Sequence, residues 1–169
     1  MTPVEHVLAW CSGTIPRFTA NAHLAVHRAT RGHVGNRVPG YRVGFLTTVG
    51  RRTGQRRTSP VLHFEDGGCT CLIASNNGAD MHPAWYGNLV AHPTAEISID
   101  RHVVPVRAEV IEDGPERDRL WAVAMATYPL YRVVSARTTR RIPLVRLIPV
   151  EEPAAAVAPW APVRAEGRQ

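Results

Sequence analysis

Three segments in the middle of the chain are rich in β-branched and aromatic residues and are separated by very short polar turns. They are residues 41–49, 56–65 and 69–75, and the turns between them read GRRTGQ and DGG. Glycine-containing turns of this length join antiparallel neighbours, whereas parallel strands need a much longer crossover. The pattern therefore predicts an antiparallel sheet built from hairpins, with Pro60 marking an edge or a bulge.

Two further regions have strand character. Residues 94–100 and 102–111 predict a second hairpin, and residues 142–150 predict a last strand. About six strands joined mainly as hairpins, with helices inserted between them, are typical of a small antiparallel barrel. The expected fold class is therefore mainly β with helices (α+β).

Two helices are predicted between the strands. Asp80 is expected to cap a short helix over residues 81–91. Asp113 and Glu116 have capping-box spacing and introduce a longer helix over residues 117–128. The apolar stripe of this longer helix is expected to consist of Leu120, Trp121, Ala124, Met125 and Tyr128.

The composition divides the chain into three parts. Residues 1–40 are expected to form an N-terminal helical segment, residues 41–150 the barrel domain, and the Ala- and Pro-rich residues 151–169 a disordered tail. His23 and His27 are four residues apart and could share a helical face. Because no third ligand of recognisable spacing follows them, no metal site is expected.

The basic character of the chain bears on its partners. The 169 residues carry a net charge of +6, and all 20 basic residues are arginine, an actinobacterial-like composition that reflects a GC-rich genome more than a function. The surplus charge implies an anionic partner, which could be a phosphorylated cofactor, nucleic acid or a membrane surface. Neither a signal peptide nor a long apolar run is evident, so a cytoplasmic protein is expected, with Cys69 and Cys71 as reduced thiols.

The turn between the first two strands gathers features that suit a phosphate. Glycines let the backbone turn tightly and expose N–H groups as an anion-binding nest, to which arginine forks and a hydroxyl would add. These residues are Gly50, Arg51, Arg52, Thr53 and Gly54. Arg56 and Arg57 should point to opposite faces of the returning strand, so only one should reach the same anion. The alternative is a solvated hairpin turn decorated with arginine.

Four blocks of sequence resemble the deazaflavin-dependent nitroreductase family. They read LTTVGRRTGQRRTSPV, IASNNGADMHPAWYGNLVAHP, YPLYRVV and RRIPLVRLIPV, and the resemblance runs from about Arg42 to Val150. Members of that family are split β-barrel oxidoreductases that use coenzyme F-420, an 8-hydroxy-5-deazaflavin. The resemblance thus implies an FMN-binding-like split barrel and transfer of a hydride from reduced F-420 to a quinone, an enone or a nitroaromatic.

The resemblance also implies roles for individual residues. The cofactor's phosphate and acidic tail would be held by Gly50, Arg51, Arg52, Thr53 and Gly54, with Arg57, Ser59 and Pro60 beside the tail and the ring. The strand end along the deazaflavin would be Ala74, Ser75, Asn76 and Asn77. The helix that closes the groove would supply His82, Pro83, Trp85 and Tyr86. Tyr128 and Tyr131 would line the substrate side, and either tyrosine or Ser75 could donate a hydrogen bond to a developing oxyanion.

The chain departs from the family pattern at three positions. Arg52 stands where lysine is frequent, which keeps the charge but changes the geometry. Leu62 and Val134 stand where some members have aromatic residues. The expected substrate pocket is therefore less aromatic, which leaves the choice between a nitroimidazole, a menaquinone and other acceptors open.

Other interpretations of the same sequence remain. A related split-barrel reductase could use FMN, and a non-catalytic basic module could bind nucleic acid, although the strands near the turn lack the aromatic residues typical of RNA-binding sheets. Trp85, Tyr86 and Tyr128 could simply be core residues. His63 and His102, like His92, are expected on the surface without a role.

Two expectations concern association. Apolar residues between positions 5 and 31, beside arginines, could give weak peripheral membrane contact, with packing of this segment on its own barrel as the alternative. An open barrel edge could pair with another chain, so either a monomer or a homodimer is expected.

Overall fold

The computed structural model describes residues 37–38 and 40–150. In chain order its elements are β1 (Arg37–Val38), β2 (Tyr41–Val49), β3 (Arg56–Asp66), β4 (Cys69–Ile73), the 3-10 turn η1 (Asn76–Gly78), α3 (Ala84–Ala91), β5 (Thr94–Ile99), β6 (His102–Val110), α4 (Pro115–Thr127), α5 (Leu130–Ser135) and β7 (Leu144–Pro149). Predictions for the first 36 residues, including those for His23 and His27, and for residues 151–169 lie outside the described residues.

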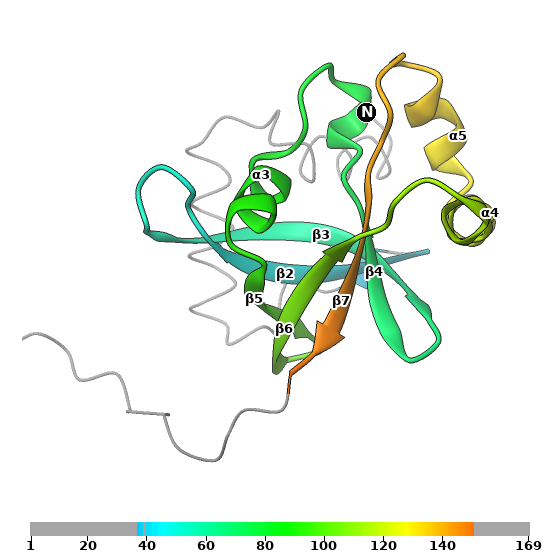
Figure 1. Ribbon diagram of the computed structural model, residues 1–169. Helices are drawn as coiled ribbons and strands as arrows, with labels where there is room; N and C mark the ends of the chain where they lie inside the picture. The colour runs from blue at the N-terminus through cyan, green and yellow to red at the C-terminus, as the bar shows by residue number, and fades with distance from the viewer. Residues whose placement is uncertain (1–36, 39, 151–169) are drawn as a thin grey trace, which may run out of the picture.

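Strands β2 to β7 form a closed antiparallel barrel. Its six strands follow the order β2-β3-β4-β7-β6-β5, and β5 pairs back with β2 to close the ring. Figure 1 shows the curved strands around one interior, with α4 and α5 together on one side and α3 apart from them. The predicted strands, the two hairpins and the split β-barrel class are confirmed.

The long strand β3 changes partners along its length. Residues 56–62 pair with β2 and residues 63–66 pair with β4. Pro60 therefore lies opposite Phe45 of β2, at a position that has no partner on β4. The missing N–H of proline is tolerated at such an edge, so the expected edge position is confirmed.

The core consists of two clusters, one on each face of the barrel wall. Side chains from all six strands fill the barrel interior together with Trp85 and Leu89 of α3: Leu46, Val61, Leu72, Ile97, Val106, Val145 and Leu147. On the outer face, α4 and α5 cover Leu62, Phe64, Ile73 and Leu144 with Leu120, Ala124, Tyr128, Tyr131 and Val134. Adjacent residues of one strand, such as Val61 and Leu62, thus enter different clusters because successive side chains point to opposite faces.

The helix starts differ from the prediction. The N-cap of α3 is Pro83, so Asp80 does not cap it. The N-cap of α4 is Gly114, with Pro115 in the first turn, and no side chain caps the helix. Pro115 fits the first helical position and moves the cap one residue beyond Asp113, whose carboxylate instead pairs with two arginines.

Helix α5 was not predicted from the sequence. It has six residues, too few for a clear apolar period, and it follows Pro129 directly after α4.

Among the described residues, no helix is long and apolar enough to cross a membrane. Within the same residues, Cys69 and Cys71 are free thiols, and burial raises the pKa of Cys71 to about 11.

Candidate functional site

The basic turn at residues 50–55 joins β2 to β3 and is closed by its own backbone. The N–H of Gly50 donates to the carbonyl of Gln55 at 2.8 Å, and the N–H groups of Thr53 and Gly54 donate to the carbonyl of Gly50 at 3.1 and 2.7 Å. Gly54 has a φ of +65°, a backbone conformation that glycine adopts without strain. The nest of exposed N–H groups expected from the sequence does not form at these positions, because their hydrogens close the turn.

Helix α3 anchors this turn from the side. The N–H of Arg51 donates to Oδ1 of Asn88 at 3.1 Å, and Nδ2 of Asn88 donates to Oγ1 of Thr48 at 3.0 Å. Asn88 and Thr48 are both buried. The Arg51 guanidinium lies across Gly87, where a Cβ would come within 1.6 Å of Nη1. The arginine is therefore seated over the face of α3.

The arginines around the turn fall into two groups. Arg56 forms an ion pair with Glu96 of β5, whereas Arg57 stays beside the turn and donates to a glutamine side chain at 2.9 Å. This confirms that the two point in different directions. Arg51 and Arg52 are exposed, and within residues 40–150 their side chains make no hydrogen bond or ion pair. Two guanidinium groups are thus available to an anion.

A narrow pocket lies between β3, the end of β4, α3 and α5. It is lined by Pro60, Val61, Leu62, Ile73, Ser75, Asn76, Pro83, Trp85 and Tyr131. Six of these residues were predicted as site residues, and they come from four separate segments of the chain. Ser75 is 8% exposed and Tyr131 is 3% exposed. Because α3 carries both Trp85 and Asn88, one helix connects the pocket to the basic turn.

The segment after β4 has an unusual backbone. Asn76, Asn77 and Gly78 all have positive φ angles, of 47°, 56° and 79°. Arg140, from the connection between α5 and β7, donates to the carbonyl of Ser75 at 2.5 Å and through Nε to the carbonyl of Ala79 at 2.6 Å. The predicted residues of this segment are therefore held from the α5 side of the pocket.

Comparison with known proteins assigns the family. A family model described as F420H(2)-dependent quinone reductase matches residues 19–149. The chain belongs to the F420H(2)-dependent quinone reductase family. This membership confirms the expected reductase class and the deazaflavin cofactor.

Relatives and solved structures agree with this assignment. An F420H(2)-dependent quinone reductase of Mycobacterium tuberculosis is 34% identical over 128 residues, which are 74% of this chain and 86% of that protein. A solved F420-H2 dependent reductase (FDR-A) has a TM-score of 0.57 and 33% identity, covering 62% of this chain and 92% of the other. A structure titled as a domain-swapped dimer has a TM-score of 0.60 and 28% identity, covering 77% and 96%.

In this quinone reductase family member, the two predicted tyrosines occupy different places. The Tyr128 hydroxyl donates to the carbonyl of His63 at 2.6 Å and accepts from the N–H of Arg42 at 3.2 Å, and its ring stacks on Tyr41. Burial raises the pKa of Tyr128. Tyr131 meets the Tyr128 ring edge-on at 6.0 Å and lines the pocket. Of the two tyrosines, Tyr131 lines the narrow pocket and Tyr128 does not.

The other predicted residues lie around the pocket. The rings of His82 and Tyr86 pack at 4.9 Å, before and within the first turn of α3. Ser59 is half-buried on β3, and the N–H of Ala74 donates to the carbonyl of Pro143 at 2.9 Å. Asn77 accepts from an arginine of the α5–β7 connection at 3.2 Å. Within the described residues, no group of three or more histidine, cysteine or acidic residues could hold a metal ion.

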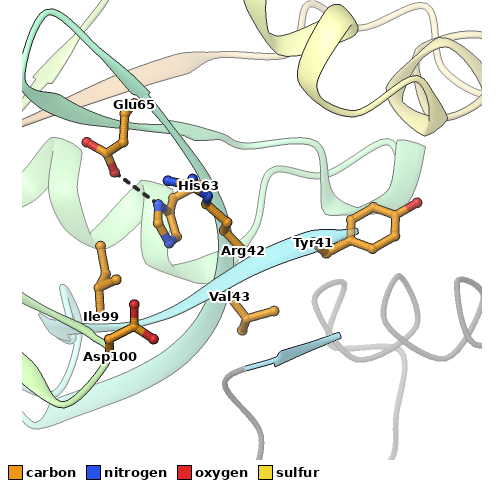
Figure 2. Close-up of a pocket in the computed structure, with 7 residues that line it drawn as sticks. All are labelled: Tyr41, Arg42, Val43, His63, Glu65, Ile99 and Asp100. Carbon is orange, nitrogen blue, oxygen red and sulfur yellow. Dashed lines mark hydrogen bonds and ion pairs between the residues drawn. The ribbon is translucent and has the colours of Figure 1, made fainter. Parts of the chain in front are cut away.

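His63 corrects one expectation, because it is only 2% exposed. Its Nδ1 lies 3.2 Å from Oε1 of Glu65, in a hollow of about 430 Å³ that also contains Arg42 and Asp100 (Figure 2). Burial lowers the pKa of His63, and Glu65 opposes the shift. This hollow shares no lining residue with the narrow pocket. His92 and His102 are exposed, as expected.

Sequence reasoning missed two residues that shape the site. Asn88 anchors the basic turn, and its signal was a polar residue three positions after Trp85, on the buried face of α3. Arg140 holds the segment after β4, but its partners in that segment lie 58 to 66 residues away in the sequence. No local pattern distinguishes Arg140 from the neighbouring arginine.

Proposed function

We propose that this family member binds reduced coenzyme F-420 with its phosphate at the basic turn and transfers hydride to a small organic acceptor, with a quinone favoured by the family. The observation that carries this proposal is a pair of exposed guanidinium groups, Arg51 and Arg52, which have no partner within residues 40–150. Helix α3 connects their turn to a pocket lined by Ser75 and Tyr131. The protein has to bind the anionic cofactor and orient the acceptor in a pocket, because the cofactor itself supplies the hydride.

The residues present fit an anionic deazaflavin. Guanidinium groups bind phosphate through charge-assisted, often bidentate hydrogen bonds. Arg51 and Arg52 would take this role, with Arg57 beside them, because Arg56 is already paired with Glu96. Pro60, at the uncovered edge of β3, would border the ring.

The pocket residues would act on the acceptor. When bound, the reduced deazaflavin supplies a hydride from carbon 5. Negative charge then develops on an acceptor oxygen, and a hydroxyl placed near it would stabilise that charge. Ser75 and Tyr131 carry the hydroxyls that line the pocket, and Trp85 and Leu62 exclude water from its walls. Leu62 would give the acceptor side an aliphatic wall in place of an aromatic ring, whereas Val134 is fully buried in the core and does not line the pocket.

A titration tests the cofactor assignment. We expect the protein to change the fluorescence of F-420 and to bind it more tightly than FMN. FMN has a phosphate but no acidic tail, so it should engage fewer of the arginines. A tighter complex with FMN would favour the alternative flavin reductase, and binding of neither would remove the proposal. Oxidation of reduced F-420 by a quinone, followed by absorbance, tests the reaction.

Three finer assignments are proposals as well. We infer that residues 41–150 act as the cofactor-binding domain and that the protein works in the cytoplasm. Pairing into a homodimer is supported by the fold of the structure titled as a domain-swapped dimer. The membrane contact proposed for residues between 5 and 31 lies outside the described residues, and co-sedimentation with liposomes tests it.

A further inference from the structure

Side chains of the α5–β7 connection hold the strained turn at residues 76–78 and the residues on either side of it. Three consecutive residues have positive φ, and two of them are asparagines, which adopt this region less readily than glycine. Such conformations persist only where the surroundings determine them, and they gather at functional sites. The turn borders the pocket through Asn76 and directly follows Ser75.

Arg140 reaches both sides of this turn. Its Nη2 donates to the carbonyls of Ala74 at 3.2 Å and Ser75 at 2.5 Å, before the turn. Its Nε donates to the carbonyl of Ala79 at 2.6 Å, and Nη1 lies 2.9 Å from Nδ1 of His82, after the turn. One planar guanidinium therefore connects four residues that span the whole segment.

The partners of Arg140 are unusual for an arginine. Four are neutral carbonyls and the fifth is an imidazole nitrogen, and among the residues described no carboxylate forms an ion pair with this guanidinium. Burial lowers the pKa of Arg140, and the charge of Asp80 opposes this. The half-buried guanidinium thus replaces part of its hydration with hydrogen bonds to the carbonyls of this segment.

Close packing supports the same connection. A Cβ at Gly78 would lie 2.7 Å from the carbonyl oxygen of Val134 and 2.7 Å from Cβ of Arg137. Nη1 of Arg137 donates to Oδ1 of Asn77 at 3.2 Å. The end of α5 therefore rests on the turn, and α5 also carries Tyr131. The segment that follows Ser75 and the helix that carries Tyr131 therefore touch at Gly78.

We propose that Arg140 is a positioning residue, which fixes the backbone of residues 74–82 so that Ser75 and the strained turn keep their places against the pocket and Tyr131. This inference rests on the proposed function, because the pocket is where the acceptor would react. Arg140 acts through the segment that it holds. Removing it should disturb the reaction more than the anchoring of the cofactor phosphate, which the basic turn provides.

Hydrogen exchange of the cofactor-free protein tests, independently of activity, whether Arg140 holds residues 74–82. The N–H groups of Gly78 and Ala79 bond to the carbonyls of Ser75 and Asn76. In Arg140→Ala these two amides should exchange at least tenfold faster, while amides of β2 and β5 stay protected. Arg140→Lys keeps the charge but not the fork, so it should give an intermediate rate and serves as the tested variant if the alanine form does not fold.

Steady-state kinetics of the folded protein provide the second measurement. Arg140→Ala should lower kcat at least tenfold and change the dissociation constant for F-420 less than threefold, with Arg140→Lys recovering part of kcat. Arg132→Ala, which removes an exposed arginine of α5, should match wild type in both measurements. Unchanged exchange at Gly78 and Ala79, or equally faster exchange throughout the barrel, would overturn the inference. If wild type fails to bind F-420, the proposed function is wrong, but the exchange result still decides whether Arg140 holds residues 74–82.

Discussion

Two arginine-rich regions flank the narrow pocket, and they use the same side chain in opposite ways. At the basic turn, Arg51 and Arg52 are exposed, and no residue between 40 and 150 pairs with their guanidinium groups. In the connection between α5 and β7, Arg140 donates to four carbonyls, three of them in residues 74–79, and contacts an imidazole. One region presents charge to solvent, and the other uses it to hold the chain.

The difference separates binding from positioning. At the basic turn the backbone closes through its own hydrogen bonds and through Asn88, so the loop keeps its shape without its arginine side chains. The segment at residues 74–82 also has backbone hydrogen bonds, but its backbone is strained and is held in addition by side chains of the α5–β7 connection. Mutations in the two regions should therefore affect different quantities.

The largest expected effect is on cofactor affinity. Replacing Arg51 and Arg52 together by alanine should raise the dissociation constant for F-420 at least about tenfold, because each lost charge-assisted bond is worth roughly 1.5–3 kcal/mol. The melting temperature of the free protein should barely move, since the backbone bonds of the turn remain. Fluorescence titration and thermal melts measure the two quantities.

Salt provides the control for this double variant. The wild-type affinity should fall as ionic strength rises, because the partner is charged and the turn is exposed, and the double variant should respond less. Affinity equal to wild type at low salt would make the turn a solvated hairpin and would remove the contrast between the two regions.

The next effect is on stability. Asn88→Ala removes the acceptor for the Arg51 N–H and the donor to the buried Thr48 hydroxyl. Leaving buried polar groups without a partner costs about 1–3 kcal/mol, so the free energy of unfolding should fall by that amount in a denaturant titration. The affinity for F-420 should fall as well, because the turn loses its anchor on α3.

A change confined to one of these two measurements would alter the comparison. If Asn88→Ala loses stability but keeps its affinity for F-420, the turn holds its shape alone. If neither quantity changes, Asn88 does not anchor it.

The fold could be predicted largely from the sequence because its signals are local. Residues 41–49 and 56–65 carry β-branched and aromatic residues on either side of a glycine-containing turn, and the observed hairpin pairs them directly. The start of α4 was misplaced because two local signals compete there: the capping-box spacing of Asp113 and the preference of Pro115 for the first helical position. Helix α5 was missed because six residues are too few to show a period.

The site was predicted in part, for a related reason. The resemblance named Ser75 and Tyr131, which the structure brings together at one pocket, and the basic turn, whose role stays a prediction. It could not tell which arginines are paired, because Arg56 and Glu96 are 40 residues apart and meet only when the barrel closes. His63 could have been recognised as buried, since it lies two residues after Val61 on the same face of β3.

Acid should speed hydrogen exchange in the segment at residues 74–82 and leave exchange in the basic turn unchanged. Burial and the charge of Arg140 lower the pKa of His82, and Asp80 and Tyr86 are the other polar groups close by. The bond to Nδ1 of His82 therefore contributes stability above about pH 6.5, the ordinary pKa of histidine, and this contribution is lost as the pH falls through the lowered value. Exchange at Gly78 and Ala79 should quicken in this window, relative to Gly54.

His82→Gln separates this effect from the rest of the protein. It should remove most of the difference in acid response between the two regions, while His63 still lowers overall stability in acid because its pKa is also lowered by burial. If exchange at Gly78 and Ala79 responds to acid in the glutamine variant as it does in wild type, protonation of His82 does not cause the response.

The smallest expected effect comes from the arginine that is already paired. Replacing Arg56 and Glu96 together by alanine removes one charge of each sign, so the net charge of the turn region is unchanged. Because the Arg56 guanidinium is engaged by Glu96 and lies on the face away from Arg57, its loss should change the dissociation constant for F-420 less than twofold. Exposed pairs of this kind contribute about 0.2–1 kcal/mol, so the stability loss should also be small. A tenfold loss of affinity would mean that Arg56 leaves Glu96 for the cofactor, and the distinction between paired and unpaired arginines would then fail at the turn itself.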